Sequence, residues 1–138
     1  MNSSNDNQNA PGPTAGLLAA DHMTGAAHAG VVLVEYGDYE CPACVEAEPV
    51  TRHLIEVFGK RMKFVFRHFP LVEVHPHAEL AAEAAEAAAA QGKFWPMHHL
   101  LFTHSPHLKL AALTKCAETI GLDMLRFNAE MADRIYTQ

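Results

Sequence analysis

Two cysteines separated by two residues, Cys41 and Cys44, are the side chains in this sequence best suited to chemistry. They lie in the stretch YGDYECPACVEAEP, residues 36–49, with Pro42 and Ala43 between them. If Cys41 starts a helix, the unpaired N–H groups and the positive end of the helix dipole there favour its thiolate. Cys41 is then the expected attacking thiol, and Cys44, one turn later, the thiol that closes a disulfide.

Zinc binding is the main alternative role for the two cysteines. A structural zinc site needs four ligands, commonly supplied as two spaced pairs. Only one other cysteine is present, Cys116, so some of the ten histidines would have to complete the site. A plain packing role for both cysteines is the second alternative, but a proline between them at a helix start suits redox chemistry better. Cys116 itself, at helical spacing from Leu113 and Ile120, is expected to be a buried apolar residue.

A strand and a helix must position this pair. The run VVLV at 31–34, continuing to Tyr36, is typical of a strand buried on both faces in a parallel sheet. A helix is expected to begin at the cysteines with Pro42 in its first position and to end at Gly59. The alternation over 62–68 predicts a second strand, parallel to the first.

The rest of the chain is predicted to be helical. Helices are expected over 76–91, over 94–104, over 109–120, and from an N-cap at Asp123 to the end of the chain. The alanines at 81, 84, 85 and 88 are expected to permit close helix packing, and the acids between them to face water. The histidine pairs at 75 and 77, 98 and 99, and 104 and 107 are expected to be mostly solvated or capping residues, because none shows the spacing of a known metal motif.

Three separated blocks occur in the order found in one protein family: VVLVEYGDYECPAC, KFVFRHFPL and HPHAELAAEAAEAAAAQGKFWPMHHLLF. Together they resemble the DsbA-like thioredoxin-superfamily thiol–disulfide oxidoreductases, over residues 21–136. The resemblance implies an α/β thioredoxin-like fold with a helical insertion, and a redox pair at Cys41 and Cys44. It also implies exchange with protein or small-molecule thiols and disulfides, without a bound cofactor. Such domains are also attached to other proteins, including sodium/proton antiporters, so a non-catalytic binding or accessory module is the alternative function.

Glu35 matches the family's acidic residue on the strand beneath the cysteines. Desolvation in this near-apolar segment is expected to raise its pKa, so that it can exchange a proton with Cys44. The alternative is that it points into water at the strand end. Ala43 stands where DsbA has a histidine, and Asp38, Glu40, Glu46 and Glu48 add negative charge that opposes a thiolate. A less oxidising pair than that of DsbA is therefore expected.

The family's C-terminal segment, a cis-proline loop followed by two strands and a helix, has no counterpart among these residues. Two strands are therefore expected where the family core has four. The outer edge of the strand at 62–68 is expected to be uncovered, with Phe64, Phe66 or Val65 partly exposed. Self-association through this edge, pairing with another chain or marginal stability is the predicted consequence, together with weak activity.

Composition excludes several other classes of protein. A length of 138 residues fits one domain, predicted over 21–138 after a disordered polar tail at 1–20. The formal net charge of −6 argues against nucleic-acid binding and against docking on anionic membranes. The N-terminal residues lack the basic start and apolar core of a signal peptide, so a cytoplasmic protein is expected. Thiols there are kept reduced, which favours catalytic over structural cysteines.

Overall fold

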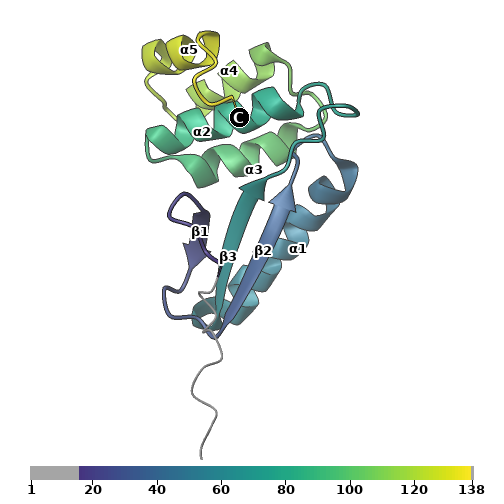
Figure 1. Ribbon diagram of the computed structural model, residues 1–138, viewed down its shortest axis with the longest axis vertical. Helices are drawn as coiled ribbons and strands as arrows, with labels where there is room; N and C mark the ends of the chain where they lie inside the picture. The colour runs from purple at the N-terminus through teal and green to yellow at the C-terminus, as the bar shows by residue number, and fades with distance from the viewer. Residues whose placement is uncertain (1–15, 138) are drawn as a thin grey trace, which may run out of the picture.

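The structure is a computed structural model that describes residues 16–137. Figure 1 shows two layers: a small sheet with one helix on its face, and a group of helices stacked across one end of that sheet. The strands are β1 (His22–Gly25), β2 (Val31–Gly37) and β3 (Met62–His68). The helices are α1 (Pro42–Phe58), α2 (Ala78–Ala90), α3 (Phe94–His104), α4 (Leu110–Thr119) and α5 (Met124–Ala132), with a short 3-10 helix at Gly59–Arg61.

The strand order in the sheet is β1-β3-β2. β2 and β3 are parallel, with Leu33 opposite Phe64, as the sequence predicts for a strand–helix–strand unit. β1 pairs antiparallel with the other side of β3, and Met23 lies opposite Val65. The sequence analysis missed this strand, because four residues reading HMTG carry no strand pattern of their own.

The strand at 62–68 is therefore the centre of the sheet, and the prediction that its edge is uncovered is wrong. Phe64, Val65 and Phe66 are buried, because β1 and β2 flank them on both sides. Within residues 16–137 the edge without a partner belongs to β2. Val31 and Tyr36 of that strand are 56% and 58% exposed, so the prediction of a strand buried on both faces is also wrong.

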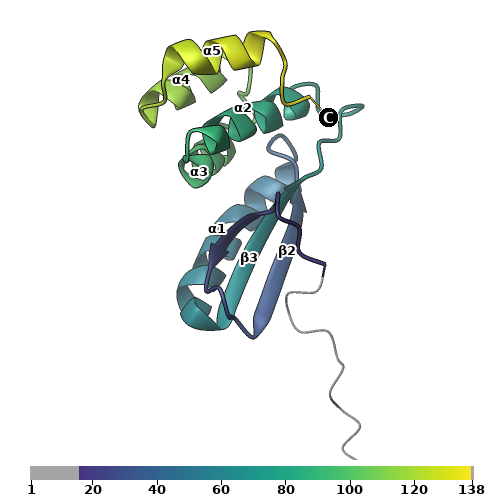
Figure 2. The ribbon, with the colours of Figure 1, turned by 60° about the vertical axis from the view of Figure 1, so that its left-hand side comes forward.

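Helix α1 begins and ends where the sequence predicts. Pro42 is its first residue and Gly59 follows its last, with a φ of 49° that glycine adopts at little cost. Figure 2 shows α1 lying along one face of the sheet. The carboxyl ends of β2 and β3 point toward the helical layer, so the residues that follow β2 lie at the junction of the two layers.

The helical layer is centred on α2. The alanines at 81, 84, 85 and 88 are fully buried, which confirms the predicted close packing against α3 and α5. α3 has the predicted bounds and buries Phe94, Leu101 and Phe102. Helix α5 starts after Asp123, whose carboxylate accepts a 3.1 Å hydrogen bond from the Arg126 amide. It ends at Ala132, so the predicted continuation to the end of the chain is wrong.

The acids of α2 do not form a wet face, contrary to prediction. Glu83 is only 2% exposed and accepts hydrogen bonds from Arg134 and Thr137. Glu86 accepts hydrogen bonds from two histidines. Local periodicity could not show this, because all these partners come from distant parts of the chain.

Most of the predicted tail at 1–20 lies outside the described residues. Residues 16–20 form turns, and the Gly16 carbonyl accepts a 2.7 Å hydrogen bond from Arg67. Arg67 also binds Asp21 with two 2.7 Å hydrogen bonds. Among the described residues no helix combines the length and apolarity that a bilayer span requires.

Candidate active site

Cys41 occupies the N-cap position of α1, at the helix N-terminus as predicted. Its backbone is extended, its carbonyl accepts a 3.0 Å hydrogen bond from Val45, and Pro42 occupies the next position. No side chain caps this end of the helix. Cys41 therefore lies at the positive end of the α1 dipole, and it is half-buried and bonded to no other sulfur.

Cys44 lies one turn into α1 and packs against the hydrophobic core. Burial raises the pKa of the Cys44 thiol to about 11, helped by the neighbouring Cys41 and Glu35, although the Asp38 backbone opposes the shift. Two pKa units above the ordinary thiol value mean about 100-fold less thiolate at neutral pH. Cys44 is therefore a thiol that burial holds in the protonated form at neutral pH.

Glu35 comes from β2 and lies beneath the start of α1. Burial raises the pKa of the Glu35 carboxyl, and the negative charge of Glu48 raises it further. The predicted direction of the shift and its main cause are both present in the structure. The alternative, a fully solvated side chain at the strand end, does not fit a half-buried residue.

A hollow of about 410 Å³ brings Glu35 and Cys44 to one surface. It is open to solvent and is lined by β2 and by the first three turns of α1, including Ala43, Ala47 and Thr51. Glu35 and Cys44 therefore line the same hollow. The unpaired edge of β2 borders it as well, so an extended chain bound there would lie beside the cysteines.

Tyr39 fixes the segment that links β2 to the cysteines. The side chain is 1% exposed and packs on Phe66 and Phe102, with ring centroids 5.5 and 4.8 Å away. Its hydroxyl forms a 3.0 Å hydrogen bond with Nδ1 of His98 on α3. Burial lowers the pKa of His98 to about 3, so this histidine is neutral. The predicted solvated or capping role is wrong for His98, which joins the active-site segment to the helical layer.

The acids around the motif form hydrogen bonds with histidines. The sequence did not predict these contacts. Asp38 is 3% exposed and accepts hydrogen bonds from the Leu71 amide at 2.9 Å and from His75 at 2.7 Å. Glu40 accepts two from His77, at 2.7 Å from its amide and 3.0 Å from its ring. These contacts hold the loop before α2 against the cysteine segment and give both carboxylates hydrogen-bond donors.

The Glu48 carboxylate lies 2.9 Å from Nε of Arg52 and 2.9 Å from Nδ1 of His99. Of the four acids expected to oppose a thiolate, only Glu46 is exposed. A less oxidising pair than that of DsbA stays a prediction.

The remaining cysteine lies elsewhere in the fold. Cys116 is buried on α4, where its sulfur is 3.7 Å from Nδ1 of His104. Burial raises its pKa, which agrees with the predicted packing role. Within residues 16–137 no third ligand converges on Cys41 and Cys44 to complete a metal site. The exposed Pro42 and Ala43 border the pair on the solvent side.

Comparisons with known proteins agree with this geometry. A family model described as thioredoxin matches residues 18–138. A thioredoxin-like oxidoreductase from Silicibacter pomeroyi superposes with a TM-score of 0.73 at 28% identity, over 81% of this chain and 63% of that one. The thiol–disulfide exchange protein α-DsbA2 from Wolbachia pipientis has the same fold, with a TM-score of 0.74 at 23% identity, over 85% of this chain and 62% of that one.

The chain is also similar to part of a much longer protein. The Na(+)/H(+) antiporter NhaA 3 of Salinispora tropica is 50% identical over 114 residues. This match covers 83% of the chain but only 17% of the antiporter. The chain thus spans about a sixth of the length of this curated relative.

Proposed function

Because the chain belongs to the thioredoxin family, with a DsbA-like fold, we propose that it is a thiol–disulfide oxidoreductase that uses Cys41 and Cys44. The observation that carries this proposal is the contrast between the two thiols. Cys41 lies at an uncapped helix N-terminus, whereas burial keeps Cys44 protonated. The substrates are proteins or small molecules that carry thiols or disulfides.

The reaction proceeds in two exchanges. The Cys41 thiolate attacks one sulfur of a substrate disulfide, forms a mixed disulfide and releases the other sulfur as a thiolate. Cys44 then loses its proton and attacks the Cys41 sulfur, which releases the second substrate thiolate. The protein gains a Cys41–Cys44 disulfide and loses two electrons, and the substrate gains them.

Glu35 is the proposed proton acceptor for Cys44. Its raised pKa is closer to neutral pH than that of an ordinary glutamate. A carboxyl with such a pKa can more readily both take up and return a proton. Replacing it by glutamine removes this proton exchange but keeps a side chain of the same shape. Glu35→Gln is expected to flatten the pH dependence of disulfide exchange, whereas Glu46→Gln, at an exposed acid of helix α1, should leave it unchanged.

Trapping the mixed disulfide tests the order of the two cysteines. With glutathione disulfide as the probe, Cys44→Ser should accumulate one glutathione on Cys41, detected by mass spectrometry after proteolysis. Cys41→Ser should accumulate much less, and Cys116→Ser should behave as the unchanged protein. Stable glutathionylation of Cys44 in the Cys41→Ser variant, at the rate seen for Cys41, would contradict the assignment.

A second candidate function rests on the similarity to the antiporter. We propose as the alternative that the chain is a thioredoxin-like module that binds an antiporter domain and needs no redox chemistry. The test is capture of this chain by the Salinispora tropica antiporter from which the matching segment has been removed. Binding that is equally strong in the Cys41→Ser/Cys44→Ser double variant supports the module, and no binding of either form rejects it.

A further inference from the structure

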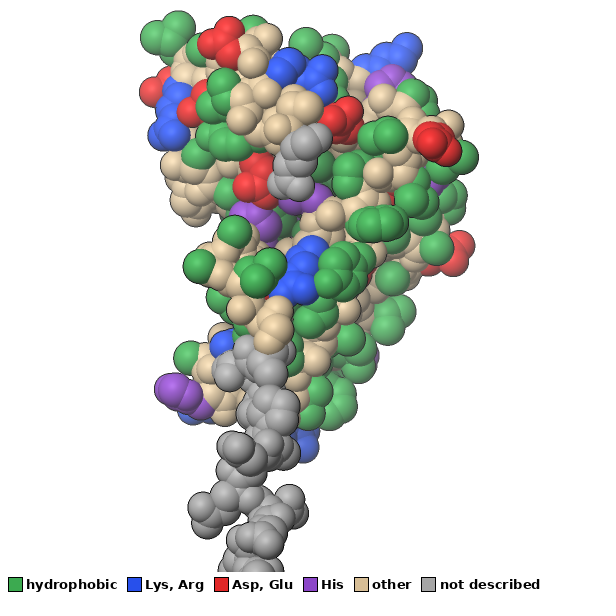
Figure 3. Space-filling model, in the orientation of Figure 1, with side chains coloured by type: hydrophobic (Ala, Val, Ile, Leu, Met, Phe, Trp, Pro, Cys, Tyr) green, Lys and Arg blue, Asp and Glu red, His purple; other side chains and the backbone are tan. Residues whose placement is uncertain are grey.

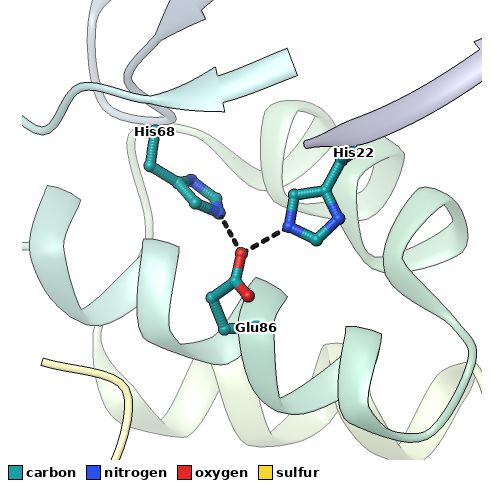
Figure 4. A group of neighbouring side chains, drawn as sticks. All are labelled: His22, His68 and Glu86. Carbon is teal, nitrogen blue, oxygen red and sulfur yellow. Dashed lines mark hydrogen bonds and ion pairs between the residues drawn. The ribbon is translucent and has the colours of Figure 1, made fainter. Parts of the chain in front are cut away.

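Two histidines and a glutamate converge where the sheet meets the helical layer. His22 is the first residue of β1, His68 the last of β3, and Glu86 lies in the middle of α2. Figure 4 shows both imidazoles directed at the same carboxylate oxygen of Glu86. The Nε2 atoms of His22 and His68 lie 2.5 and 2.9 Å from it.

The two rings are held in place by the aromatic core. The His22 ring stacks on Phe94, with centroids 3.6 Å apart and planes 3° from parallel. The His68 side chain is 7% exposed and packs edge-to-face against the rings of Phe66 and Phe94. Because packing already fixes both rings, binding a ligand between them would cost little side-chain entropy.

The spacing of the three donor atoms suits a small cation. The Nε2 atoms and the carboxylate oxygen all lie within 4.8 Å of one another. A tetrahedral zinc ion with bonds of about 2.0–2.1 Å holds its ligand atoms about 3.3 Å apart. The two nitrogen–oxygen distances therefore need to widen by less than about 1 Å, which side-chain rotation alone can supply.

The cluster can also be reached from a hollow in the surface. A hollow of about 420 Å³ opens on His68 and Glu86, and Glu79, Glu83 and Tyr136 form part of its wall. Figure 3 shows acidic and histidine side chains together at this junction of the two layers. Arg134 pairs with Glu83 at 2.8 Å, so the charge of this wall is partly balanced. Water in the hollow is available as a further ligand.

We propose that His22, His68 and Glu86 bind a divalent transition-metal ion of the zinc class, through the two Nε2 atoms and the carboxylate, with water from the hollow as the fourth ligand. Two imidazoles and one carboxylate are the donor set of known three-ligand zinc sites. The ion ties β1, β3 and α2 together. The site is separate from Cys41 and Cys44, so the proposal holds whether or not these cysteines are redox-active.

One feature sets the expected strength of binding. The other nitrogen of His68, Nδ1, is buried and has no hydrogen-bond partner within residues 16–137. Tight zinc sites usually supply an acceptor behind each ligating ring, and losing one lowers affinity by about 10–100-fold. Binding weaker than that of a fully supported zinc site is therefore expected.

Metal titration of a thiol-free chain tests the proposal. In the Cys41→Ser/Cys44→Ser/Cys116→Ser background, one equivalent of Co²⁺ should give the intense visible bands of four-coordinate cobalt, and Zn²⁺ should displace it. His22→Phe keeps a ring to stack on Phe94 but removes the ligand, and Glu86→Gln removes the anionic oxygen. Each should lower affinity by at least about 100-fold. His107→Gln, on an exposed histidine, should change nothing.

Histidine ring resonances followed by NMR provide a readout that needs no ligand substitution. The first equivalent of Zn²⁺ should shift the signals of His22 and His68 before those of the other histidines. Affinity that is unchanged in His22→Phe, or first-equivalent shifts confined to other histidines, would overturn the proposal. Failure of the thiol-free chain to take up Co²⁺ or Zn²⁺ would overturn it too, and would leave the cluster as a hydrogen-bonded bridge between the layers.

Discussion

Replacing His98 by glutamine should remove a pH-dependent part of the free energy of unfolding. His98 is 3% exposed and pairs with the Tyr39 hydroxyl, which anchors the segment leading to Cys41. Burial, and to a lesser degree the nearby His99, His68 and His22, lowers the pKa of His98 from 6.5 to about 3. The folded protein therefore holds this ring neutral at pH values where the unfolded chain protonates it.

The size of the effect follows from this difference in pKa. Below pH 6.5 the unfolded chain gains a proton on His98 that the folded protein does not accept until about pH 3. Stability that is fully present above pH 6.5 is thus lost as the pH falls, by about 1.4 kcal/mol per pH unit. Between pH 7 and pH 5 the loss amounts to about 2 kcal/mol, a large share of the 5–15 kcal/mol typical of a small domain.

Urea unfolding at pH 7 and pH 5, followed by far-ultraviolet circular dichroism, measures this loss. The glutamine amide can both donate and accept, so His98→Gln can keep a hydrogen bond to Tyr39 whichever partner carries the proton. Other titrating groups are common to both proteins, so the difference between them isolates His98. Between pH 7 and pH 5 the free energy of unfolding should fall by about 2 kcal/mol more in the unchanged protein than in His98→Gln.

The exposed His53 supplies the control, because His53→Gln should show no such shift. The reasoning would be refuted if the two proteins, unchanged and His98→Gln, differed in free energy of unfolding by the same amount at pH 7 and at pH 5. It would mean that His98 is protonated in the folded state, or open to water.

Three further changes have clear expected outcomes. Gly37→Ala would place a methyl group 2.3 Å from the Phe66 ring, so it should destabilise the fold by about 1–3 kcal/mol in urea unfolding, and an unchanged midpoint would count against the packing described. Ala43→His adds a positive or hydrogen-bonding group beside the Cys41 thiolate and should raise the reduction potential by about 30 mV or more in glutathione equilibration; a lower potential would contradict this. The edge open to pairing is that of β2 and not that of the strand at 62–68 as predicted. Val34→Lys places a charge on this edge, so we expect it to lower the concentration-dependent light scattering of the chain. Scattering equal to that of the unchanged chain at every concentration would show that chains do not pair through the β2 edge.

The sequence by itself determined most of the local elements and the position of the cysteine pair. Pro42 and Gly59 mark both ends of α1, because one lacks the N–H that a helix start leaves unused and the other tolerates a positive φ. The spacing of Cys41 and Cys44 then identified the motif. Each of these inferences depends on residues close in the chain, where geometry follows from the sequence. Glu35 was identified in another way, by its match to the acidic residue that the resembling family carries on this strand.

Tertiary structure decided which partners meet across the chain. β1 is too short to predict, yet it makes β3 the central strand and leaves β2 as the edge. The sequence predicts that the acids of α2 face solvent. In the structure Glu83 and Glu86 instead contact residues more than fifty positions away, Arg134 and His22. His98 became a buried neutral group, and His22, His68 and Glu86 a cluster, for the same reason. A side chain's burial and charge depend on what the folded chain brings against it, and helical or strand periodicity carries no information about contacts at such separations.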